Sequence, residues 1–139
     1  MNIKEGLDYF PFPIDFFLDE KIQFISAKFG MKGEAIVIRL ICRIYRKGYY
    51  TDWSDDIALL FSKEIGDNCD VSFVNKVVQE LVGRGFFNNN IFEVYEVLTS
   101  CYIQERFLFA TKRRIQVEMR EELVLAEVSE HPNVNIIPM

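Results

Sequence analysis

The chain has 139 residues, half of them apolar and 14% aromatic, which supplies the core of one compact domain and argues against a disordered chain. The formal net charge of −5 excludes a uniformly basic nucleic-acid coat but not a local basic surface. A single histidine, His131, and the lack of Walker-type and G-x-G-x-x-G loops predict a protein that is not an enzyme and holds no metal or cofactor.

The first predicted element is an aromatic arm, residues 1–14. Pro11 and Pro13 forbid a regular helix or a central strand here, so the arm is extended. Its aromatic rings must be buried either on the arm's own domain or on a neighbouring molecule, and these two alternatives weigh equally. The candidate self-association residues are Tyr9, Phe10, Phe12 and Phe16.

Two helices are predicted next, over about 15–29 and 33–47, because apolar residues recur at helical spacing and Gly30 ends the first. The second is apolar around most of its circumference and is expected to be central. Its cations form one basic stripe, Arg39, Arg43, Arg46 and Lys47. The stripe either contacts phosphates or pairs with carboxylates of the first helix, such as Asp15, Asp19 or Glu20, and pairing is slightly favoured.

A short strand is expected at about 49–53, followed by a helix over 54–65. Ser54 is its predicted N-cap, and Asp55 and Asp56 favour the first turn of a helix over a calcium site. Another helix covers about 71–84, with an apolar face that includes Val74, Val77 and Leu81. A short turn joins these two helices.

The stretch "GFFNNNIFEVY" predicts a hairpin with strands at about 86–88 and 91–94 around Asn88–Asn90, because asparagine tolerates positive φ. A long last helix is predicted over 99–126, and residues 127–139, with two prolines, read as a flexible tail. The fold class is therefore mainly α (α+β), one winged helix-turn-helix domain over 1–126 with its core at 15–98.

Four segments carry a resemblance to a known family: "YFPFPIDFFLDEKI", "FGMKGEAIVIRLICRIYRKGYYTDW", "VNKVVQELVGRGFFNNNIF" and "VLTSCYIQERFLFATKRR". Together they span about residues 9–114. The chain resembles the N-terminal winged-helix domain of phage replisome organisers, a DnaD-like group. The resemblance implies a role in DNA binding or replication, support for self-association outside the winged helix, and relatives that continue into a further C-terminal domain.

Besides the basic stripe, three further surfaces are candidates for DNA contact. In a helix-turn-helix the later helix enters the major groove, and here helix 71–84 offers an exposed face that is only weakly basic and includes Glu80. The "NNN" turn has no lysine or arginine for phosphates, whereas "TKRR" is the strongest basic cluster. Each face also fits an ordinary solvated surface. The candidate residues are Ser72, Asn75, Lys76, Gln79 and Arg84 on the helix, and Lys112, Arg113 and Arg114 in the cluster.

We therefore expect a non-catalytic DNA-binding or replication-organising module that binds DNA weakly and forms a homo-oligomer. The alternative is a protein–protein scaffold of the same fold that does not bind DNA. Candidate partners are DNA and replication proteins, with no membrane. The odd, widely spaced cysteines, Cys42, Cys69 and Cys101, and the absence of a signal-peptide pattern predict a cytoplasmic protein with reduced thiols.

Overall fold

The computed structural model of the protein describes residues 4–66 and 68–139, and it is mainly helical with two small sheets. The elements, in chain order, are the 3-10 helix η1 (Phe16–Leu18), α1 (Glu20–Lys47), β1 (Thr51–Asp52), α2 (Asp55–Ile65), α3 (Val71–Gly83), α4 (Asn89–Tyr95), β2 (Val97–Leu98), α5 (Cys101–Ala110), β3 (Val117–Arg120), the 3-10 helix η2 (Glu121–Leu123) and β4 (Val134–Ile137). This arrangement confirms the mainly helical α+β class.

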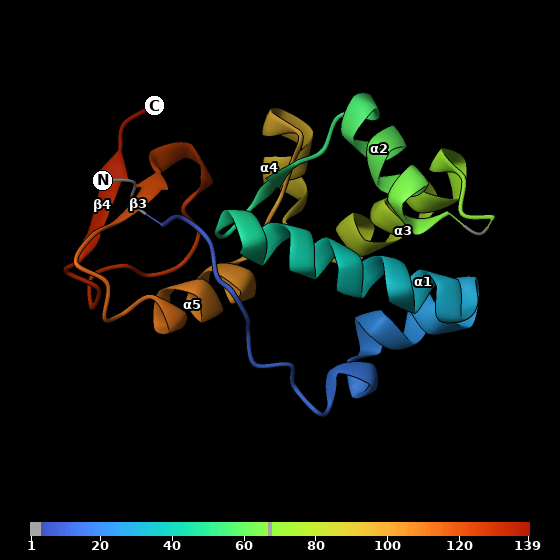
Figure 1. Ribbon diagram of the computed structural model, residues 1–139, viewed down its shortest axis with the longest axis horizontal. Helices are drawn as coiled ribbons and strands as arrows, with labels where there is room; N and C mark the ends of the chain where they lie inside the picture. Colours follow the sequence, from blue (N-terminus) through green and yellow to red (C-terminus); the bar gives the residue numbers. More distant parts are fainter. Residues whose placement is uncertain (1–3, 67) are drawn as a thin grey trace.

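Helix α1 crosses the middle of the molecule, with α2 and α3 on one side and α5 with the β3–β4 sheet at one end (Figure 1). Asp19 caps it by accepting a hydrogen bond from the Lys21 N–H at 2.8 Å. Gly30 breaks it with φ 69° and ψ −157°, a conformation that side chains disfavour, so the predicted boundary is a kink between two helical halves. The first half begins at Glu20 rather than at residue 15.

Helix α3 packs against both α1 and α2, and this contact forms the core. Ile36, Leu40 and Ile44 of α1 are fully buried, and so are Val77 and Leu81 of α3. Ser54 caps α2 as predicted, since its Oγ accepts from the Ile57 N–H at 3.2 Å. The strand predicted at 49–53 is present as β1, which pairs antiparallel with β2.

The predicted hairpin around Asn88–Asn90 is wrong, and so are the strands at 86–88 and 91–94. These residues, all described, contain the helix α4 instead. Asn88 has φ −68° and its Oδ1 accepts from the Ile91 N–H at 2.9 Å, so it acts as an N-cap rather than as a turn residue. The structure therefore has no hairpin wing in this segment, and β1 is paired by Val97–Leu98.

The predicted helix over 99–126 is also wrong, because α5 ends at Ala110. Residues 117–120 form β3, in which buried Val117 and Met119 alternate with outward-facing residues. Buried Gln104 of α5 binds the backbone of the segment that follows β3. Its Nε2 donates to the Leu123 carbonyl at 2.7 Å, and its Oε1 accepts from the Leu125 N–H at 2.7 Å. A continuous helix would separate residues 104 and 123 by about 28 Å.

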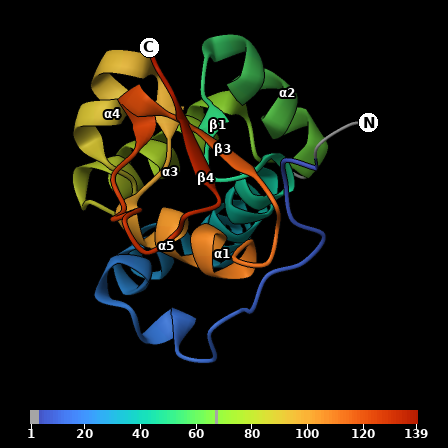
Figure 2. The same ribbon diagram turned by 90° about the vertical axis from the view of Figure 1, so that its left-hand side faces the viewer.

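The predicted tail at 127–139 contains β4, which pairs in parallel with β3 from Val117↔Val134 to Arg120↔Ile137. Figure 2, viewed from this end, shows the two strands lying over the end of α1. In the part of the chain that the structure describes, none of the helices combines the length and apolar character that a membrane span requires.

Candidate nucleic-acid interface

The outer face of α1 after its kink is basic. Its exposed residues are Met31, Lys32, Ala35, Arg39, Cys42, Arg46 and Lys47. The single carboxylate of residues 31–47, Glu34, is half-buried and accepts a hydrogen bond from the Ser26 hydroxyl. Because α-helices rise 1.5 Å per residue, the cations from Lys32 to Lys47 extend over about 22 Å.

The basic stripe predicted on this helix is not paired with the first helix. Across residues 4–66 and 68–139, no ion pair involves Arg39, Arg43, Arg46 or Lys47. The predicted pairing with Asp15, Asp19 or Glu20 is therefore wrong. Arg43 is half-buried, and its Nε donates to the Thr51 hydroxyl at 3.1 Å.

The stripe leads into a cleft at the C-terminal end of α1. The cleft mixes charges: its cations are Lys4, Arg46, Lys47, Arg114 and Arg120, and its carboxylates are Glu5, Asp8, Asp52 and Glu118. Lys4 pairs with Asp8 and holds the pKa of that carboxyl below its usual range. The mixture makes this cleft less attractive to phosphate than the open face of α1, with which it shares Arg46 and Lys47 at its edge.

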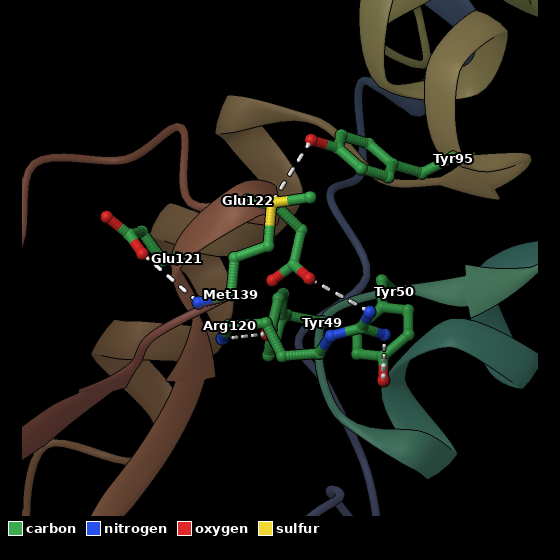
Figure 3. A network of polar contacts seen from close by, with 7 residues as sticks. All are labelled: Tyr49, Tyr50, Tyr95, Arg120, Glu121, Glu122 and Met139. Carbon is green, nitrogen blue, oxygen red and sulfur yellow. Dashed lines mark hydrogen bonds and ion pairs between the residues drawn. The ribbon is translucent and has the colours of Figure 1, made fainter.

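Arg120 is held in a polar network beside this cleft (Figure 3). Its backbone N–H donates to the Tyr49 hydroxyl at 2.8 Å, and its guanidinium donates to the Tyr50 hydroxyl at 3.4 Å and to Glu122 at 3.0 Å. Burial raises the pKa of Tyr49 to about 12, so this phenol stays protonated at neutral pH. The network fastens β3 to the end of α1, and Arg120 is engaged structurally.

One side of α3 carries a shallow groove shared with α1. Lys28 and Phe29 of α1 line it with Ser72, Lys76 and Gln79 of α3, all three exposed. Glu80 is ion-paired with Lys28 at 3.0 Å and with Arg84, and their hydrogen bonds hold the pKa of Glu80 below its usual range. Arg84 also lies 3.6 Å from the ring centroid of Phe24. Among the described residues, Lys76 is thus the cation on this face of α3 that takes part in no ion pair.

The other side of α3 is acidic. A second shallow cleft brings Asn75 and Gln79 together with four carboxylates of α2, α4 and the following turn: Asp55, Asp56, Glu93 and Glu96. The Asn75 amide oxygen accepts a hydrogen bond from the Trp53 indole N–H at 3.2 Å, so this half-buried side chain positions Trp53. The face of α3 therefore divides into a basic and an acidic half, a division that appears only when α2 and α4 are placed.

The "TKRR" cluster follows α5 as a turn. Arg114 donates to the Lys4 carbonyl at 3.0 Å and to the Gly6 carbonyl at 2.7 Å, so it holds the N-terminal segment. Lys112 and Arg113 are exposed, and Lys112 lies 4.2 Å from the ring centroid of Phe109. The three cations that the sequence groups together thus have different surroundings.

The aromatic arm divides into inward and outward rings. Phe16 is buried, and Phe10 is half-buried with its ring centroid 4.9 Å from that of Tyr45. Tyr9 and Phe12 are exposed. Between the arm, α1 and α5 lies a cavity of about 690 Å³. The arm therefore packs partly on its own domain.

Sequence reasoning missed the outward face of α5. Tyr102, Arg106 and Phe109 follow i, i+4, i+7 spacing, with Tyr102 56% and Phe109 61% exposed. The spacing is visible in the sequence. The prediction of one helix over 99–126 left this face unrecognised. Lys112 reaches Phe109 because α5 ends at Ala110 and the chain turns there.

The comparisons with known proteins decide the family. Residues 9–103 match the family model described as "Lin1244/Lin1753-like, N-terminal". The chain belongs to the Lin1244/Lin1753-like family. One curated relative, the "uncharacterized phage-related protein Lin1244/Lin1753" of Listeria innocua serovar 6a, is 37% identical over 124 residues, which is 88% of this chain and 40% of the relative. This Lin1244/Lin1753-like chain thus spans about two fifths of the relative's length, and no solved structure matches it significantly.

Proposed function

We propose that this chain is a non-catalytic, cytoplasmic DNA-binding module of a phage-type protein, with a replication-organising role. The observation that carries the proposal is the outer face of α1, where Lys32, Arg39, Arg46 and Lys47 are exposed and take part in none of the ion pairs of residues 4–66 and 68–139. A row of cations whose one helix carboxylate, Glu34, is half-buried and bonded to Ser26 suits a phosphate chain. Phosphate contacts predict weak, salt-sensitive binding with little sequence preference.

We also propose that α1, α2 and α3 form a winged-helix variant in which α4 replaces the hairpin. The support is the short connection between α2 and α3 and the antiparallel pairing of β1 with β2. Because Asp55, Asp56, Glu93 and Glu96 flank one side of α3, its insertion into a major groove brings carboxylates close to phosphates. The open face of α1 is therefore the better duplex contact.

The second candidate function is a protein–protein scaffold that does not bind DNA. The acidic half of α3 favours it, together with the ion pairs in which Glu80 engages both Arg84 and Lys28. The exposed aromatic residues of the arm further support self-association into a homo-oligomer.

The test is the salt dependence of binding to a labelled DNA duplex, measured by fluorescence anisotropy. Replacing Arg39, Arg46 and Lys47 together by alanine should flatten the slope of log affinity against log salt by roughly 2–3 units, because each lost phosphate contact removes about 0.9. The control triple Arg39→Lys, Arg46→Lys and Lys47→Arg keeps the charge and should keep the slope. An unchanged slope in a folded alanine triple removes α1 as the contact, and no binding of the wild type at low salt favours the scaffold.

A further inference from the structure

The outward face of α5 alternates aromatic rings and cations. We call Tyr102, Arg106, Phe109 and Lys112 the α5 ladder. The Arg106 guanidinium lies 5.8 Å from the Tyr102 ring centroid, and the Lys112 ammonium lies 4.2 Å from the Phe109 ring centroid. Both aromatic residues are more than half exposed, Tyr102 at 56% and Phe109 at 61%. Each cation lies over one face of its ring, and exposed aromatic rings with cations close by are the elements of a stacking platform for nucleobases.

The charges of this face are complementary to a phosphate chain. Arg106, Lys112 and neighbouring Arg113 take part in none of the ion pairs found over residues 4–66 and 68–139. Glu105 is the carboxylate of α5, and it accepts a hydrogen bond from the Cys101 thiol at 3.2 Å. Residues 101–113 thus carry three cations against one carboxylate, a net positive charge for this segment.

The adjoining cavity sets the direction of approach. Tyr102 and Arg106 line the cavity between α5 and the arm, where Asp15 and Asp19 also contribute. These carboxylates repel phosphates from the arm side of the cavity. A strand that follows the α5 ladder from Tyr102 towards Lys112 and Arg113 stays on the basic side.

The spacing of the two rings favours a single strand over a duplex. Tyr102 and Phe109 are seven residues apart on one helix face, so their Cα atoms lie about 10 Å apart. Bases in a duplex are stacked about 3.4 Å apart along each strand and offer no free faces to side chains. Rings at this separation suit bases that are splayed from an extended strand.

We propose that the α5 ladder binds single-stranded nucleic acid, with bases stacked on Tyr102 and Phe109 and phosphates held by Arg106, Lys112 and Arg113. This inference rests on the proposed function, nucleic-acid binding, and names its substrate class and a second contact surface. Stacking accepts every base, so the binding has little sequence preference.

The experiment compares binding of a labelled oligo-deoxythymidine strand of about 16 nucleotides with binding of a duplex of the same length, at one salt concentration. The wild type should prefer the single strand. Tyr102→Leu and Phe109→Leu keep apolar bulk but remove the flat rings, and each should weaken single-strand binding roughly 5- to 100-fold while duplex affinity is unchanged. Phe109→Tyr should retain binding. Val94→Ala, a change at an exposed apolar residue of α4 outside the ladder and the arm, should have no effect.

The outcomes separate the two proposals. Equal affinity for both probes, with no effect of the leucine variants, overturns the single-strand inference and leaves duplex binding through α1 intact. A change in self-association, measured by sedimentation, without a change in single-strand affinity makes the face a protein contact and overturns it as well. No binding to either probe at low salt overturns this inference and the proposed function together. Circular dichroism establishes that each variant is folded.

Discussion

Arg114 connects two distant parts of the chain at the scale of single residues. Its guanidinium donates to the carbonyls of Lys4 and Gly6, and the Leu7 N–H donates to the Tyr45 carbonyl at 2.7 Å. Gly6 is required for this approach, because a Cβ there would lie 1.8 Å from the Arg46 carbonyl oxygen. The N-terminal segment is thus held against the end of α1 by a cation that the sequence assigns to DNA.

Arg114→Ala should therefore reduce stability, because hydrogen bonds from a charged group to two carbonyls are lost. The free energy of unfolding should fall by about 1–2 kcal/mol, allowing for partial solvent exposure. Urea denaturation followed by circular dichroism measures the change. Arg113→Ala is the matched control, since Arg113 is exposed and should leave the unfolding free energy almost unchanged. Equal effects of the two substitutions would contradict a structural role for Arg114.

Asn88 shows, at the scale of elements, why the segment after α3 was predicted incorrectly. Asparagine favours both tight turns and helix N-caps, because its short side chain bonds nearby backbone groups in either geometry. Here Asn88 is extended and caps α4 through the Ile91 N–H. Tertiary pairing decides between the two, since β1 finds its partner at Val97–Leu98 after the helix.

Asn88→Ala should destabilise the domain by about 1 kcal/mol, the usual value of a lost N-cap. Asn90→Ala is its control, because Asn90 is exposed within α4 and alanine is a better helix former. Thermal or urea unfolding of the two variants measures the difference. If these residues formed a hairpin, Asn90→Ala would destabilise the domain more than Asn88→Ala, because Asn90 would be the turn residue. The backbone chemical shifts of residues 89–95 would then report strand instead of helix.

The sequence predicts the elements whose determinants are local. Helical spacing and caps suffice for α2 and α3, and Gly30 suffices for the kink of α1. The C-terminal third depends on distant contacts. Buried Gln104 bonds the backbone of residues 123–126 in addition to the nearby Thr99 hydroxyl, and β3 is paired with β4 across a long connection. The candidate site follows the same division: the cations are visible in the sequence, but their partners, such as Gly6 for Arg114, are not.

Part of the exposed apolar surface lies away from the cations of α1. The arm and η1 expose Tyr9 at 84%, Ile14 at 103% and Leu18 at 73%, whereas the exposed rings of the α5 ladder are interspersed with cations. Several large apolar residues exposed within one short segment make that segment a candidate contact with a partner. Nucleic-acid binding and self-association therefore need not compete for one surface.

Self-association is expected through the outward residues of the arm rather than through all of its rings. Deleting the arm removes Phe10 from Tyr45 as well, and so confounds association with stability. The triple Tyr9→Ser, Ile14→Ser and Leu18→Ser changes exposed positions alone, and it should shift the protein towards monomer in sedimentation equilibrium with an almost unchanged unfolding free energy.

The control for this triple is Leu59→Ser with Leu60→Ser, two exposed leucines of α2 that lie outside the arm. It should leave the association constant unchanged, because hydrophobic association depends on apolar surface that is removed from water at the contact itself. A wild-type protein that is monomeric at every concentration ends the prediction. A control variant that dissociates as strongly as the arm triple moves the contact from the arm to α2, where Leu59 and Leu60 would then be buried between copies.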